Sequence, residues 1–232
     1  GAAPGGPVRV SWQALVEPAW NLDSWRALAR HGWEAEVPPE RMDFADHSQG
    51  SLLPSPPLAQ APRLRSGLNV PAAFVEMAGR VLCHRDPDRH GLLYRVLWRI
   101  GNGERGLMQR VTDRDIHRLT AMEKEVRRDV HKMKAFVRFR AVPGQLETYS
   151  AWFEPDHLIV DRVAPFFMRR FTGMQWSILT PYRSALWDGQ SLWLGPGGTR
   201  EQVPAEDDSE ELWRTYYANI FNPARLNTRM MR

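Results

Sequence analysis

The chain has 232 residues, 43% of them hydrophobic, and its 31 Lys and Arg against 27 Asp and Glu give a formal net charge of +4. This length suffices for one large domain, or one domain with a small appendage, without stabilising cross-links. The sole cysteine, Cys83, excludes an intramolecular disulfide, a zinc ribbon, a CxxC redox pair and an iron–sulfur cluster held by several thiolates of this chain. Because no run approaches eighteen apolar residues and no signal peptide opens the chain, we expect a soluble, cytoplasmic protein with no membrane partner.

The start of the chain predicts a small αβ segment followed by a long loop. A strand is expected over 8–12, and a helix over 23–31 that ends at Gly32. From 46 to 70 the sequence is rich in Pro and Ser and has no periodicity, as in a linker. We therefore expect an N-terminal αβ segment over 1–45, a linker or long loop over 46–70, and a main α+β domain over 71–232 that continues past Arg232.

Helices are expected in the first part of the main domain. Apolar residues recur at intervals of three and four over 72–84 and over 87–100, and the second run stops at a Gly-Asn-Gly sequence. The clearest pattern runs from Ile116 to Met133, and Thr112 with Asp115 resembles a capping box at its start. These patterns predict a long helix that ends near residue 134.

The second half of the main domain predicts an antiparallel sheet. Alternation from Ala135 to Ala141 indicates a strand, and Pro143 with Gly144 turns the chain into a returning strand over Thr148–Phe153. Three more strands are expected over 175–180, 185–187 and 192–194, and a final helix before Asn222-Pro223. The predicted fold class is α+β, with a helical first half packed on an antiparallel sheet formed mainly by the second half.

The basic residues of the chain are concentrated in one segment. Arg127–Arg140 (RRDVHKMKAFVRFR) contains six Lys or Arg and one acidic residue. Concentrated positive charge with interspersed rings is what binding phosphates and stacking on bases requires. We therefore expect DNA or RNA as the partner. The expected contact residues are Arg127, Arg128, Lys132, Lys134, Phe136, Arg138, Arg140, Arg214 and Arg225.

Two other functions fit the same sequence. An enzyme acting on a nucleobase or nucleotide would use His131, Glu154 and His157 as acid–base groups around a pocket floored by Trp152 and Trp176. A protein–protein adaptor would instead place the basic segment against an acidic surface. No catalytic motif is present, so the catalytic residues stay unknown. Without an HExxH motif, a Cys/His cluster or a phosphate loop, neither a metal site nor a cofactor is expected.

Five segments carry a resemblance to a known family. They are DVHKMKAFVRFR (129–140), AWFEPDH (151–157), APFFMRRF (164–171), WSILTP (176–181) and LWRTYYANIFNPARLN (212–227). In this order they resemble a bacterial family of unknown function associated with DNA metabolism, over about 71–227. Members of that family occur beside a radical-SAM protein of DNA repair or modification, or fused N-terminal to a uracil-DNA glycosylase-superfamily domain.

The resemblance implies a pathway without supplying a reaction. It implies that this chain binds nucleic acid and presents it to a partner or fused enzyme in DNA repair or modification. The glycosylase signatures and the radical-SAM cysteine triplet are absent from these 232 residues. Any uracil-DNA glycosylase activity of the parent protein is therefore expected in a domain after Arg232.

Overall fold

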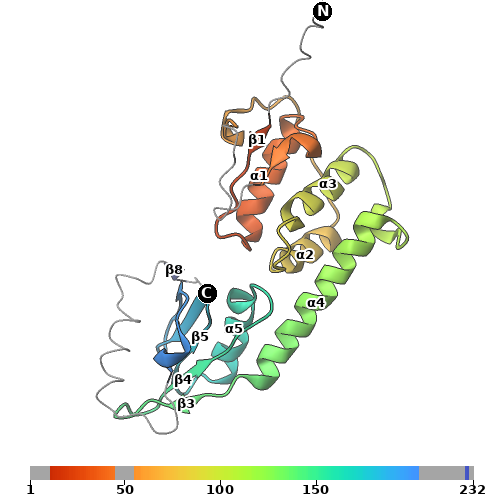
Figure 1. The fold of residues 1–232 in the computed structure, drawn as a ribbon. Helices are drawn as coiled ribbons and strands as arrows, with labels where there is room; N and C mark the ends of the chain where they lie inside the picture. Colours follow the sequence, from red (N-terminus) through yellow and green to blue (C-terminus); the bar gives the residue numbers. More distant parts are fainter. Residues whose placement is uncertain (1–10, 45–54, 204–227, 230–232) are drawn as a thin grey trace, which may run out of the picture. The chain divides into compact units, whose positions relative to one another are not determined.

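The computed structural model describes residues 11–44, 55–203 and 228–229 (Figure 1). Internal contacts divide the chain into two compact units, Gly1–Val126 and Arg127–Arg232. The division falls within a single long helix, where no change of composition marks it. The domain ranges expected from composition therefore stay a prediction. Among the described residues, no helix is long and apolar enough to cross a membrane.

The N-terminal unit is mainly helical, and most of its expected helices are confirmed. Its elements are β1 (Trp12–Gln13), α1 (Leu22–Glu34), η1 (Pro39–Arg41), β2 (Met42–Asp43), η2 (Leu58–Gln60), α2 (Ala72–Val81), α3 (Arg89–Gly101), η3 (Leu107–Gln109) and the start of α4 (Arg114–Phe136). Strands β1 and β2 pair in parallel. The expected strand over 8–12 lies largely outside the described residues.

A core of aromatic and aliphatic side chains holds the N-terminal helices together. Trp25 of α1 packs on Phe74 of α2 with ring centroids 6.3 Å apart, and both side chains are fully buried. The buried Tyr94 hydroxyl donates a hydrogen bond to the Val37 carbonyl at 2.6 Å. Burial of such rings accounts for much of the stability of a helical unit of this size.

Helix α4 begins at a different cap from the one predicted. Asp113, not Thr112, supplies the capping side chain: its Oδ1 accepts the backbone N–H groups of Asp115 at 3.0 Å and Ile116 at 3.2 Å. An aspartate at this position satisfies N–H groups that have no partner within the helix. The prediction of a cap at the start of α4 was thus wrong by one residue.

The C-terminal unit contains a six-stranded sheet in the order β3-β4-β5-β6-β7-β8. Its elements after α4 are β3 (Arg140–Ala141), β4 (Thr148–Trp152), α5 (Val160–Arg170), β5 (Gln175–Leu179), β6 (Arg183–Trp187), β7 (Leu192–Pro196), η4 (Arg200–Gln202) and β8 (Thr228–Arg229). The α+β class is confirmed, with helices mostly in the first half. The hairpin of β3 and β4 is also confirmed.

The sheet is mixed, because β4 and β5 run parallel. The segment between them, which showed no clear pattern in the sequence, is the helix α5 and provides the crossover that parallel neighbours require. Its buried side chains, Val160, Val163, Ala164 and Phe167, lie on one face and pack on the sheet. The expectation of a wholly antiparallel sheet was therefore wrong at this pair of strands.

The strand expected over 135–141 is much shorter in the structure. Helix α4 continues to Phe136, and only Arg140 and Ala141 pair with β4. Phe139 points inward, as expected from its place among the apolar residues of the alternating pattern, and its ring meets those of Phe167, Phe171 and Trp176 at centroid distances of 5.8, 5.3 and 5.8 Å. This aromatic cluster anchors the chain between α4 and β3.

Candidate nucleic-acid interface

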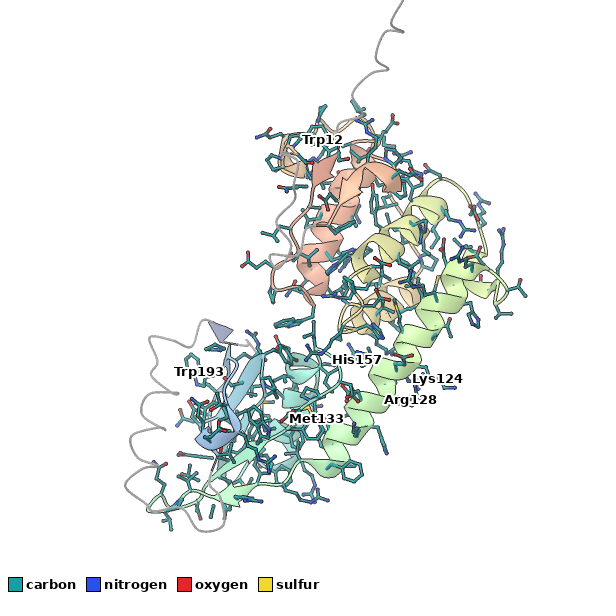
Figure 2. All side chains as sticks on the ribbon, in the orientation of Figure 1. Trp12, Lys124, Arg128, Met133, His157 and Trp193 are labelled. Carbon is teal, nitrogen blue, oxygen red and sulfur yellow. The ribbon has the colours of Figure 1, made fainter. Side chains whose placement is uncertain are left out.

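The last three turns of α4 present a basic face to solvent. Successive side chains on an α-helix are 100° apart, so Arg127, Arg128, His131 and Lys134 lie on the side opposite Met133. All four are exposed, whereas Met133 is buried. Figure 2 shows Arg128 pointing outward from α4, while Met133 points into the C-terminal unit. The sequence between Arg127 and Phe136 therefore folds into one basic and one packed face.

The cations of this face are largely unneutralised. Arg127, Arg128 and Lys134 make no ion pair with a carboxylate among the described residues. Lys132 is paired with Asp156 at 3.1 Å, but both side chains are more than half exposed. An ion pair so exposed contributes little and opens readily. Asp129, the sole acid of this stretch, is 3% exposed on the opposite side of the helix.

Helix α5 adds a second basic row beside the first. The Lys134 ammonium lies over the Phe166 ring, 4.7 Å from its centroid, which joins the basic face of α4 to α5. On α5, Arg162, Arg169 and Arg170 are exposed and lie on the same side of the helix as Phe166. We define the basic surface by seven cations: Arg127, Arg128, Lys132, Lys134, Arg162, Arg169 and Arg170.

Two predicted contact residues, Arg138 and Arg140, do not extend this surface. The Arg138 Nη1 donates to the carbonyls of Ala135 at 2.7 Å and Val137 at 3.1 Å, and so caps the end of α4. Arg140 is opposite Ser150 in the β3–β4 register, on the face of the sheet that α5 does not cover. The basic face of α4 is therefore not continued by these two strand residues, and α5 supplies the adjoining row of cations instead.

The remaining predicted contacts are an aromatic ring and two arginines. Phe136, the final residue of α4, is 62% exposed. Its ring is open to solvent, and its stacking on a base stays a prediction. Arg214 and Arg225 lie outside the described residues.

The three acid–base candidates do not converge. Asp129 Oδ2 accepts the His157 backbone N–H at 2.8 Å, which places the 153–159 loop on the buried side of α4. His131 lies on the exposed side of that helix, two residues or about 200° further round. Glu154 is exposed and accepts a hydrogen bond from the Trp152 indole at 2.9 Å.

The predicted floor of an enzyme pocket is also divided by the sheet. Trp152 pairs with Leu179, whereas Trp176 pairs with Tyr149, three positions along β4 from Trp152. Side chains an odd number of residues apart on a strand point to opposite faces. Trp176 is fully buried beside α5. Trp152 packs on Leu179 of the neighbouring strand, on the opposite face of the sheet. These two indoles cannot form one pocket floor.

Sequence reasoning missed the arginines of α5. The signal was present as two adjacent arginines after a Phe-Phe pair in APFFMRRF (164–171). Pro165 and the dense aromatic residues hid the helical periodicity, so Arg169 and Arg170 were not placed on a helix face. Recognition of α5 as a helix would have put both beside Phe166.

The fold and the site together define an α+β protein. Its C-terminal unit carries a basic surface formed by the helices α4 and α5. Residues 87–232 match the family model described as "Domain of unknown function (DUF4130)". This match covers more than half of the chain, and the chain therefore belongs to that family. No curated protein and no solved structure gives a significant match.

Proposed function

We propose that this chain binds nucleic acid through the basic surface of α4 and α5 and presents it to a partner or fused enzyme of DNA repair or modification. The observation that carries the proposal is the set of exposed cations without acidic partners on α4, Arg127, Arg128 and Lys134. Phosphates would displace solvent counterions from this face without first breaking protein ion pairs.

Aromatic rings beside the basic rows support single-stranded nucleic acid as the preferred form. Phe136 is exposed at the end of α4, and the partly buried Phe166 ring lies under the Lys134 ammonium, between the basic rows of α4 and α5. Unpaired bases stack on such rings, whereas the bases of a duplex are already stacked on each other. Cations beside rings are the usual composition of a groove that follows a single strand.

The biological setting rests on the family resemblance and on composition. DNA repair or modification is the pathway that the resemblance implies, with a uracil-DNA glycosylase domain or a radical-SAM protein as the neighbour that receives the strand. A cytoplasmic location agrees with the use of a single cysteine in 232 residues. In this proposal the chain supplies binding, and the neighbour supplies the chemistry.

The proposal is tested by neutralising the α4 face. The variant R127Q/R128Q/K134Q removes three phosphate contacts, so affinity for a fluorescein-labelled 20-nucleotide single strand at 50 mM KCl should fall roughly ten- to hundredfold. Fluorescence anisotropy at several KCl concentrations measures both the affinity and its salt dependence. Adding R169Q/R170Q on α5 should weaken binding further.

A matched control distinguishes the loss of specific contacts at the basic surface from the loss of positive charge in general. The variant R30Q/R105Q/R200Q removes the same three charges at exposed arginines outside the basic surface. Its affinity should stay within about threefold of the unaltered chain, because a distant exposed charge adds only a screened long-range attraction. Equal losses in the two triple variants, or no loss in either, would refute the proposed interface. Binding of an acidic protein but not of DNA would indicate an adaptor instead.

A further inference from the structure

The N-terminal unit contains an open cleft of about 780 Å³ that the proposed function does not use. One wall is a face of α3 with Gly91, Arg95 and Arg99 spaced one turn apart. The second wall is the start of α4, where Arg114 and Arg118 are also one turn apart. The third wall is the 39–44 segment of η1 and β2. The volume is in the range of small-molecule sites.

The aspartates of the cleft are engaged by its arginines. Arg99 donates to both oxygens of Asp113, at 3.1 and 2.7 Å. Asp115 accepts from Arg99 and is also ion-paired with the Arg95 Nε, both at 3.2 Å. The Arg99 hydrogen bonds lower the pKa of Asp113 to about 2, so the carboxylate stays ionised at neutral pH. These carboxylates fix the position of the guanidinium groups.

Three arginines retain donors that face no partner within the described residues. Arg95 makes its ion pair through Nε, which leaves the two Nη groups. Arg118 uses Nη2 for Asp86 and Asp88, at 2.8 and 3.0 Å, which leaves Nε and Nη1. Arg114 is exposed and has no hydrogen bond or ion pair to any described residue. Carboxylates thus hold the guanidinium groups of Arg95 and Arg118 on one side and leave the other side open, while Arg114 is unpaired among the described residues. Open guanidinium donors suit a phosphate, which accepts several hydrogen bonds at once.

The third wall complements a ligand with a flat apolar part. Pro39, Met42 and Phe44 contribute side chains to it, and the Phe44 ring is held by Tyr94 at a centroid distance of 5.7 Å. A ligand that bears phosphate at one end and a ring at the other would meet the arginines and this wall together. Nucleotides have this composition.

We propose that this cleft binds the phosphate monoester of a nucleotide, either a free mononucleotide or the 5′-terminal nucleotide of a strand. Four arginines and four carboxylates line it, so the lining has no net charge. Recognition there depends on directed hydrogen bonds from Arg95, Arg114 and Arg118. The site is separate from the basic surface, and either can be lost without the other.

Gly91 makes a clean blocking variant possible. A Cβ at Gly91 would meet no atom within 4 Å, so a larger side chain there enters open space in the cleft. Leucine is also a far better helix former than glycine, so Gly91→Leu should not unfold α3. The second variant, R95Q/R114Q, removes two guanidinium groups and keeps the Asp113 network of Arg99 intact.

The experiment is isothermal titration calorimetry with thymidine 5′-monophosphate, and with thymidine as the phosphate-free comparison. The unaltered chain should bind the monophosphate, and thymidine at least about tenfold more weakly, because thymidine lacks the charge-assisted hydrogen bonds that the phosphate accepts. Gly91→Leu and R95Q/R114Q should each weaken monophosphate binding at least about tenfold. The control R30Q/R105Q should bind as the unaltered chain does.

Single strands with and without a 5′-phosphate distinguish the two sources of the nucleotide. They are compared in the R127Q/R128Q/K134Q background, where the basic surface is neutralised. Preference for the phosphorylated strand over the free monophosphate indicates a strand end, and the reverse indicates a free nucleotide. Equal binding of thymidine and its monophosphate, or undiminished binding by Gly91→Leu, would overturn the proposal. Failure of the basic surface alone would leave monophosphate binding in place.

Discussion

The two units use the same residue, arginine, in opposite ways. In the N-terminal unit Arg99 makes five hydrogen bonds to Glu104, Asp113 and Asp115, at 2.7–3.2 Å. On α4 of the C-terminal unit Arg127 and Arg128 have no carboxylate partner among the described residues. The first arrangement fixes local structure and directs a few donors, and the second leaves positive charge that no carboxylate of the described residues neutralises. The position of the carboxylates, rather than the net charge of +4, therefore decides what each arginine can do.

The largest expected difference between the two regions is in salt dependence. If four cations of α4 contact phosphates, single-strand affinity should fall roughly 50-fold between 50 and 200 mM KCl. Thymidine monophosphate binding in the cleft should change by less than about threefold, because its lining has no net charge. Anisotropy and calorimetry at the two salt concentrations measure these ratios. Similar ratios at both sites would contradict the distinction between long-range electrostatic attraction at the basic surface and directed hydrogen bonds in the cleft.

The next effect is on stability, measured by urea unfolding. Arg99→Ala should destabilise the chain by about 2–3 kcal/mol, because it removes a 24% exposed guanidinium and leaves three carboxylates close together. Arg127→Ala should change the free energy of unfolding by less than about 0.5 kcal/mol, as expected for an exposed residue without partners. Equal effects would show that the Arg99 network contributes no more than a surface charge.

A third effect is the response of the N-terminal unit to acid. The pKa of Asp113 is lowered from 3.8 to about 2, so its ionised form stabilises the folded state. That contribution, on the order of 2 kcal/mol, is complete above about pH 5 and is lost as the pH falls through 4 toward 2. Asp113→Asn should flatten the stability profile in this window, and R127Q/R128Q/K134Q should leave it unchanged. Unfolding curves from pH 2 to pH 5 measure both.

The smallest effect concerns Arg138, which bears on the extent of the basic surface. Arg138→Ala should cost about 1 kcal/mol, because the carbonyls of Ala135 and Val137 lose their side-chain donor at the end of α4. Single-strand affinity should stay within about twofold of the unaltered chain. A loss of affinity comparable to that of Arg128→Gln would show that Arg138 contacts phosphates as part of the basic surface.

Local patterns in the sequence predicted those parts of the fold that depend on neighbouring residues. The apolar spacing of 116–133 predicts α4, and the strands expected over 185–187 and 192–194 are β6 and β7, which pair antiparallel as predicted. The parallel pairing of β4 with β5 depends instead on α5, whose periodicity is obscured by Pro165 and neighbouring phenylalanines.

The candidate sites divide in the same way. The basic face of α4 follows from helical spacing within one segment, so its cations were predicted. The cations of α5 could not be predicted as part of this surface, because their position depends on the contact between Lys134 and Phe166, which are 32 residues apart in the sequence. The cleft required three segments, 39–44, 87–99 and 113–118, to come together, which no local pattern predicts.

Gly91 carries a consequence for directed evolution. A glycine inside a helix lowers its stability by about 0.5–1 kcal/mol relative to alanine, and nothing in the described structure crowds this one. In a library selected for heat resistance alone, Gly91 should therefore be replaced early, and the new side chain would occupy part of the cleft. A library selected for biological activity should keep the glycine. Such a result would indicate that ligand binding in the cleft requires a residue that lowers the stability of α3.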